Sequence, residues 1–235
     1  IKTFEINQLV TYVCVLHTEK SRGNFIKPKF ESPSTMVEEQ QFLVPLDTYL
    51  KAGLHIGTKF RTKYMAPFIY KIRPDGLAVL NIQEINRRIE LVSRFVSKFV
   101  PHEILVVGKR ENGWKAINMF SKITGIRNYA GNYHAGVLTN PQLEEFTEIK
   151  VLICTDPWPD KDAVRDAVKT GATVIALCDT NNESNYIDIV IPCNNKGKKS
   201  LGLFFWIIAK EYMKNRGLIK PGEEINIKIE DFIEE

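Results

Sequence analysis

The chain has 235 residues, 44% of them hydrophobic and 26% charged, which is enough to bury the core of one large globular domain. No apolar run approaches the roughly 18 residues that a membrane span needs, so we expect a cytoplasmic protein with no membrane partner. Four cysteines and four histidines show no metal-ligand spacing, which argues against a metal site and indicates a reducing compartment.

The net charge of +4 is unevenly distributed along the chain. Residues 221–235 hold six acids and one base, which leaves 31 basic and 22 acidic residues before them. A basic body favours polyanionic partners such as nucleic acid. A merely solubilising surface is the alternative explanation.

The order of patterns along the chain divides it into four parts. Residues 1–35 show no sustained period and are expected to be a flexible extension of uncertain origin, because Met36 opens a segment that reads like an ordinary protein start. Residues 36–76 are expected to pack on the body as an N-terminal segment. Residues 77–217 form the predicted α/β/α domain, and residues 218–235 an acidic C-terminal tail.

Strands and helices alternate within the body. Short apolar runs predict five strands, at residues 77–82, 104–107, 151–155, 173–178 and 187–191. Helical periodicity and glycine stops predict four helices, at residues 84–100, 113–124, after an N-cap at Asp160, and at 200–215. The strands are continuously apolar, which is typical of a parallel sheet covered on both faces. We therefore predict a three-layer, doubly wound α/β domain with a mostly parallel sheet of about five strands.

An enzyme of this architecture would carry its chemistry after the carboxyl ends of the strands. No glycine follows the run at 77–82, and the loop from Gly108 to Gly113 places Trp114 where a phosphate-binding lysine should stand. Asp156 and Asp179 end two strands and could hold Mg²⁺ or act as a base, although we favour turn-stabilising roles for both. We predict no catalytic residue, no metal, no cofactor and no small-molecule substrate.

Basic residues gather in two segments, one with interleaved aromatic side chains. The first spans Lys59 to Arg73, where we expect Phe68 to point inward and the charges outward. The second spans Lys196 to Lys220, and its first lysines precede a predicted helix. This helix is apolar nearly all round at its start, which predicts burial on several sides, either in the chain's own core or against a partner. Lysine and arginine neutralise phosphates, and aromatic faces stack on exposed bases. The predicted RNA contacts come from these two segments and from the loop that starts at Gly108. They are Lys59, Arg61, Lys63, Lys71, Arg73, Lys109, Arg110, Lys196, Lys198, Lys199, Lys214 and Arg216.

The acidic tail carries a second predicted contact. Ile225, Ile227 and Ile229 alternate with polar residues, which predicts an added edge strand that pairs with a partner protein.

Several ordered blocks between Leu43 and Arg216 resemble one family, the small-subunit ribosomal protein of the universal S-two family. These blocks read Tyr-Leu-Lys-Ala-Gly-Leu-His-Ile-Gly-Thr at 49–58, Ile-Arg-Pro-Asp-Gly-Leu-Ala-Val-Leu at 72–80, Gly-Val-Leu-Thr-Asn-Pro at 136–141, Val-Ile-Ala-Leu-Cys-Asp-Thr-Asn-Asn at 174–182, and Ile-Asp-Ile-Val-Ile-Pro-Cys-Asn-Asn-Lys-Gly-Lys-Lys-Ser-Leu-Gly at 187–202. The resemblance implies a flavodoxin-like fold without catalysis. The block at 131–136 departs from the family pattern by lacking an arginine and a proline.

The bacterial form of this family inserts a helical hairpin for which the ten residues after Pro141 leave no room, so the resemblance points to the archaeal-eukaryotic type. It implies a structural constituent of the small ribosomal subunit that binds rRNA and neighbouring ribosomal proteins and supports translation. The alternative hypothesis is a nucleotide- or metal-dependent enzyme that uses Asp156 and Asp179.

Overall fold

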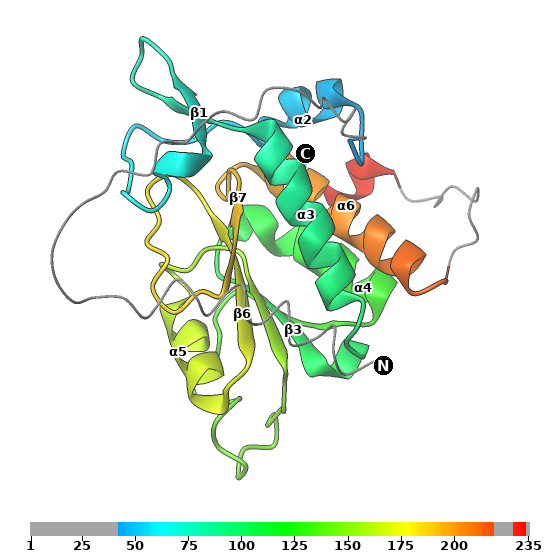
Figure 1. Ribbon diagram of the computed structural model, residues 1–235. Helices are drawn as coiled ribbons and strands as arrows, with labels where there is room; N and C mark the ends of the chain where they lie inside the picture. The colour runs from blue at the N-terminus through cyan, green and yellow to red at the C-terminus, as the bar shows by residue number, and fades with distance from the viewer. Residues whose placement is uncertain (1–41, 219–227, 234–235) are drawn as a thin grey trace, which may run out of the picture. The chain divides into compact units, whose positions relative to one another are not determined.

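The computed structural model describes residues 42–218 and 228–233, and a five-stranded parallel sheet forms their centre (Figure 1). Its strands are β3 (Ile104–Gly108), β4 (Arg127–Ala130), β5 (Val151–Cys154), β6 (Thr173–Cys178) and β7 (Ile189–Pro192). They lie in the order β4-β3-β5-β6-β7, and each neighbouring pair is parallel. The second strand along the chain lies outside the first, which is the flavodoxin-like order. The predicted fold class is confirmed.

Helices cover both faces of this sheet. The four long helices are α3 (Ile82–Val96), α4 (Trp114–Thr124), α5 (Lys161–Thr170) and α6 (Lys198–Asn215). Both α3 and α4 pack against α6, whereas α5 contacts β5 and β6 from the other side (Figure 1). Every residue of β3 and β5 is buried, because both faces of the sheet are covered. None of the described helices is both long and apolar enough to cross a membrane.

The first predicted strand does not belong to this sheet. The apolar run at residues 77–82 forms β2 (Ala78–Leu80), which pairs antiparallel with β1 (Ile69–Ile72) in a separate two-stranded sheet. The place of a fifth strand is taken by β4, which the sequence pattern missed because Arg127 and Asn128 interrupt its hydrophobicity. A short apolar run predicts a strand but does not identify its partner.

The helix boundaries follow local capping chemistry. Helix α3 starts two residues earlier than predicted because the Asn81 side chain accepts a hydrogen bond of 3.0 Å from the Gln83 amide. It ends at Val96 rather than residue 100, and Pro101 opens a separate 3-10 turn, Pro101–Glu103. Gly125 closes α4 in the left-handed conformation, as predicted, and Gly171 does the same for α5.

The segment before the sheet packs on the same core. Helix α2 (Leu46–Ala52), which the sequence pattern did not predict, buries Tyr49 completely, and the Tyr49 hydroxyl donates to Asn86 on α3 at 3.0 Å. A 3-10 turn, Ala66–Phe68, then buries Phe68, as predicted, and leads into β1. All described residues fall within one compact unit that starts at Gln40.

Helix α6 is buried on several sides within this chain's own core. Its Phe204 and Phe205 are almost fully buried, and Phe205 packs 5.5 Å from the Phe120 ring on α4. The remaining side is covered by a 3-10 turn at Ile229–Phe232, in which Phe232 is 1% exposed. The tail segment that the sequence assigned to a partner protein therefore includes residues that complete the core.

Candidate nucleic-acid interface

The carboxyl edge of the sheet is where a fold of this type accommodates ligands, in the crevice where the strand order reverses. Here that crevice lies between β3 and β5, with Lys109 and Arg110 following one strand and Asp156 following the other. The side chains at this edge therefore decide whether the crevice is open to a ligand.

An ion pair connects the two strand ends at this crevice. Arg110 donates from Nε to the Asp156 carboxylate at 2.6 Å and approaches the same oxygen through its terminal nitrogen at 2.5 Å. The other oxygen of Asp156 accepts from Asn182 Nδ2 at 2.9 Å and from the Trp158 amide at 3.1 Å. Asp156 is 1% exposed and has both oxygens satisfied, so it has no open position for a metal or a substrate.

The second acid is held in the same manner. One oxygen of Asp179 accepts from the Thr180 amide at 2.6 Å, and the other accepts from Lys196 Nζ at 3.0 Å. Asn182 connects the two acids, because its Oδ1 accepts from the Asp179 amide at 2.8 Å while its Nδ2 donates to Asp156. The turn-stabilising roles that we favoured for both acids are confirmed, and the ion pairs are an additional feature of the tertiary structure.

Asp160 lies beside this network and differs from its predicted role. It occupies the N-cap position of α5, but its side chain accepts from the Lys109 amide at 3.0 Å instead of from the helix. Burial, reinforced by the charge of Asp156, raises the pKa of Asp160 to about 7. The Asp160 carboxylate thus connects the loop after β3 to the start of α5, although burial disfavours its ionised form.

Other residues with potential metal or redox chemistry are dispersed. Among the described residues no group of three or more His, Cys, Asp or Glu side chains could hold a metal ion. Cys154, Cys178 and Cys193 are buried in the core, and burial raises the pKa of each thiol. They are packing residues, whereas Cys14 lies outside the described residues.

The first basic segment is attached directly to the carboxyl edge. The Thr58 amide donates to Thr180 Oγ1 at 2.9 Å, and the Thr62 amide donates to the Thr180 carbonyl at 2.9 Å. A Cβ on Gly57 would lie only 2.6 Å from Thr180 Cγ2, so this close approach requires glycine. The attachment holds an exposed loop that carries Lys59, Arg61 and Lys63.

The hairpin formed by β1 and β2 continues this basic surface. Lys71 and Arg73 are exposed, and Tyr70, which precedes them in the chain, is 75% exposed. The hairpin therefore presents an aromatic ring and two cations to solvent. In Figure 1 the hairpin extends away from the parallel sheet.

The second basic segment is divided by the structure. Lys198 and Lys199 are exposed in the first turn of α6, close to Lys196, whose carbonyl accepts from Asn112 at 2.7 Å. Lys214 and Arg216 lie at the other end of this 18-residue helix, about 27 Å away at 1.5 Å per residue. The second basic segment therefore forms two separate clusters of cations.

Arg110, Lys196, Lys214 and Arg216, which are among the predicted RNA contacts, have partners within the chain. Arg110 and Lys196 hold the two buried acids, and Lys214 lies 3.7 Å from Glu211. Arg216 packs over the Tyr212 ring at 5.5 Å and donates to its hydroxyl at 2.6 Å. Sequence spacing could not reveal the two pairs with buried acids, since Arg110 and Asp156 are 46 residues apart and Lys196 and Asp179 are 17 apart.

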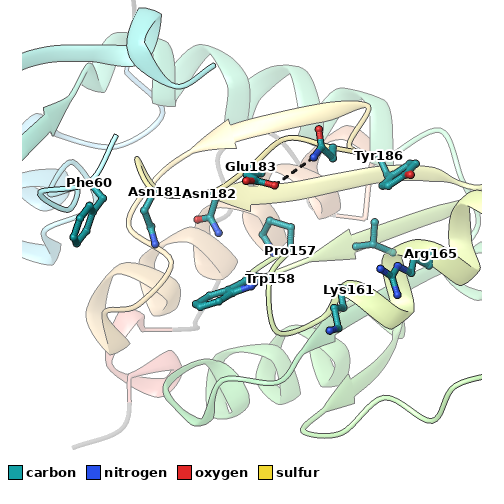
Figure 2. Close-up of a pocket in the computed structure, with 11 residues that line it drawn as sticks. Phe60, Pro157, Trp158, Lys161, Arg165, Asn181, Asn182, Glu183 and Tyr186 are labelled. Carbon is teal, nitrogen blue, oxygen red and sulfur yellow. Dashed lines mark hydrogen bonds between the residues drawn. The ribbon is translucent and has the colours of Figure 1, made fainter. Parts of the chain in front are cut away.

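The structure also exposes a groove that the sequence reading missed. Phe60, Trp158 and Tyr186 surround it, with Lys161 and Arg165 on the α5 side (Figure 2). The available signal was Trp158 itself, because a large aromatic residue between Pro157 and Pro159 in a turn is poorly placed to be buried.

The predicted protein contact in the tail is only partly described. Ile225 and Ile227 lie outside the described residues. Ile229 begins a 3-10 turn that packs on α4 and α6, so at this residue the expectation of an edge strand was wrong. Ile229 and Phe232 pack on the chain's own core.

The chain is similar in sequence to known proteins of one family. A sequence model of the family described as Ribosomal protein S2 matches residues 143–214. A protein of Nanoarchaeum equitans is 50% identical over 190 residues, which cover 81% of this chain and 94% of the relative. Proteins of Picrophilus torridus and Pyrobaculum islandicum are 40% and 44% identical, covering 83% and 84% of this chain and 97% of each relative. All three bear the name small ribosomal subunit protein uS2.

Proposed function

Because the chain belongs to the ribosomal protein S2 family, whose archaeal relatives are named small ribosomal subunit protein uS2, we propose that it binds rRNA through exposed cations around the carboxyl edge of its sheet. The chain is a structural, non-enzymatic component of the small ribosomal subunit, and it acts in the cytoplasm as part of that particle. The residues that contact rRNA are the part of the function that needs a test.

The observation that carries this proposal is the attachment of the basic loop to the Thr180 turn. Three cations, Lys59, Arg61 and Lys63, are held exposed beside an edge whose own acids are already neutralised. Arg110 and Lys196 cancel the charges of Asp156 and Asp179 internally. The field outside this edge is therefore dominated by exposed cations, which attract phosphates.

The proposed contact set is smaller than the set expected from the sequence. We assign phosphate contacts to eight exposed cations of the expected set. These residues are Lys59, Arg61, Lys63, Lys71, Arg73, Lys109, Lys198 and Lys199. Arg110, Lys196, Lys214 and Arg216 support the fold instead.

The enzyme alternative has no support in the site. It required Asp156 and Asp179 to offer free carboxylate oxygens, and each carboxylate is satisfied by side chains and amides of this chain. Neighbouring ribosomal proteins are proposed partners from the family relationship, and their contact residues are not assigned.

Assembly of small subunits with charge-reversal variants tests the proposal. The double variant Lys198→Glu/Lys199→Glu should co-sediment less than the wild type, and the slope of log affinity against log salt should fall by about 2, one for each lost phosphate contact. The matched control is Lys98→Glu/Lys122→Glu, which reverses two exposed lysines outside the proposed set. Equal incorporation of both double variants at every salt concentration would show that the start of α6 makes no phosphate contact.

A further inference from the structure

A groove of about 580 Å³ lies beside the carboxyl ends of β5 and β6. Its walls come from the loop that holds Phe60, from the turn at residues 157–161, and from residues 181–186 after β6. Figure 2 shows Phe60 at one end and Tyr186 with Arg165 at the other, with Trp158 and two asparagines between them. Residues far apart in the sequence thus form one elongated surface.

Three of the most exposed aromatic side chains in the described part of the chain belong to this groove. Phe60 is 81% exposed, Trp158 is 75% exposed and Tyr186 is 67% exposed. Large aromatic side chains gain most when they are removed from water, so their clustering on one surface indicates an occupant. The occupant must present flat or apolar faces to three rings.

Tyr186 is held in the groove in an unfavourable backbone conformation. Its φ of 64° makes it the only non-glycine residue in the described ranges with a positive φ. A side chain with a Cβ adopts this conformation at an energetic cost, and such costs concentrate at binding sites. Glycine at this position would relieve the backbone strain, but the chain has a tyrosine there.

The polar residues of the groove identify the class of occupant. Lys161 and Arg165 are exposed on successive turns of α5, and Asn181 and Asn185 add amide groups. Glu183 is the one acid in the lining, and its carboxylate accepts a hydrogen bond of 3.3 Å from Asn185. Aliphatic contact is limited to Val164 and Pro157. A groove for an apolar peptide would need a larger aliphatic floor, whereas aromatic faces, cations and amides match the base, phosphate and base edge of a nucleotide.

We propose that this groove binds unpaired nucleotides of the rRNA, with bases stacked on Trp158 and Tyr186 and phosphates beside Lys161 and Arg165. The inference rests on the proposed ribosomal function and extends it, because it adds base stacking by residues outside the basic segments. Stacking on an aromatic ring tolerates any base, so the groove selects single-stranded character rather than sequence.

Chemical probing of assembled small subunits tests this proposal. Subunits are assembled with the wild-type chain, with Trp158→Ser, or with Tyr70→Ser, which removes an equally exposed ring (75%) outside the groove. Dimethyl sulfate and a carbodiimide report the reactivity of all four bases. Trp158→Ser should raise the reactivity of a few neighbouring unpaired nucleotides by about 5-fold or more, and Tyr70→Ser should leave those nucleotides unchanged.

A photo-crosslinker gives a second readout that does not depend on removing the aromatic ring. Replacement of Trp158 by p-benzoyl-phenylalanine keeps an aromatic group in the groove, and irradiation of these subunits should attach the chain to the same nucleotides. A crosslink to a ribosomal protein would overturn the proposal in favour of an acidic peptide segment. Normal incorporation with neither a crosslink nor a change in base reactivity would also overturn it, because the groove would then be open to solvent.

The two proposals fail in distinguishable ways. If the Lys198→Glu/Lys199→Glu variant assembles like the wild type, the phosphate contacts proposed for the start of α6 are wrong, whatever happens at Trp158. If that variant is impaired as expected and the groove shows neither protection nor an RNA crosslink, only the stacking inference is lost.

Discussion

The guanidinium group of Arg110 lies 2.5 Å from the carboxylate of Asp156, in the crevice between the carboxyl ends of β3 and β5. Related architectures leave this crevice open for a ligand. Here a side chain from one strand end neutralises the acid at the other, so a fold with the layout of a nucleotide enzyme carries a structural ion pair at its ligand position.

Removal of the two partners of this pair should have unequal effects. Arg110→Ala leaves the Asp156 charge buried without its partner, and we expect a loss of about 2–3 kcal/mol in unfolding free energy, below the fully buried value because the arginine side chain is one-third exposed. Asp156→Asn keeps an acceptor for Asn182 and leaves Arg110 near solvent, so it should cost less. Urea denaturation of the full chain measures both, with Lys109→Ala as an exposed control expected within about 0.5 kcal/mol of wild type. Equal losses for Arg110→Ala and Asp156→Asn would contradict this account.

Asp160 should make the stability of the protein depend on pH. Its pKa in the folded chain is raised to about 7 from 3.8, so the folded state binds this proton more tightly than the unfolded state. The ionised group therefore costs free energy above pH 7, and the cost disappears as the pH falls towards 4. We expect Asp160→Asn, which keeps an acceptor for the Lys109 amide, to stabilise the chain by about 2–4 kcal/mol at pH 8 and by much less at pH 4. Asp162→Asn, an exposed acid in the same helix, is the control; a gain for Asp160→Asn that is the same at both pH values would refute the assignment.

Gly202 should respond differently to substitution in the full and truncated chains. A Cβ at this position in α6 would lie 2.8 Å from Ile233 Cγ1 and 3.1 Å from the Phe232 carbonyl oxygen. In the full chain, Gly202→Ala should therefore displace the turn that buries Phe232 and destabilise the fold. In a chain that ends after Leu218 the clash is absent, so the same substitution should stabilise α6 by up to about 1 kcal/mol through helix propensity. Thermal unfolding of the four chains measures the difference, and the same sign in both backgrounds would show that the turn does not dock on Gly202.

Tyr186 should be a position where stability and binding conflict. Its positive φ predicts that Tyr186→Gly relieves a strain of about 1–2 kcal/mol, of which the greater freedom of glycine in the unfolded chain offsets a part. Tyr186→Ala keeps the strain and serves as the matched control, because both variants remove the ring. Urea denaturation should show the glycine variant to be the more stable of the two by up to about 1 kcal/mol, and the reverse order would show that the backbone at this residue is unstrained.

Sequence periodicity predicted those elements whose burial is complete. The run at 173–178 was predicted residue for residue, because β6 lies between β5 and β7 in the parallel sheet, with helices on both faces, and its sequence must be apolar throughout. The same reasoning did not predict the edge strand β4 or the pairing of β2. Strand β4 is polar because it lies at an edge, and β2 is as apolar as a sheet strand although it pairs with β1 instead.

The twelve predicted RNA contacts illustrate the same limit at the level of side chains. Composition identifies cations but not their partners, so Arg110 and Lys199 are equivalent in the sequence and differ in the structure. The groove could not be predicted for a related reason. Phe60, Trp158 and Tyr186 are separated by 98 and 28 residues, and they form one surface only when the loops after β5 and β6 meet the basic loop.

The sequence by itself determined the fold class, the absence of a phosphate-cradling loop and, through its ordered blocks, the family. These properties depend on local periodicity, on glycine positions and on contiguous residues, all of which are visible in one dimension. Only the tertiary structure decided which charges are internal, which strand pairs with which, and where the tail packs. Those outcomes depend on contacts across 46 residues for Arg110 with Asp156 and 118 residues for Lys115 with Ile233, and no local pattern encodes the partner in a contact of that range.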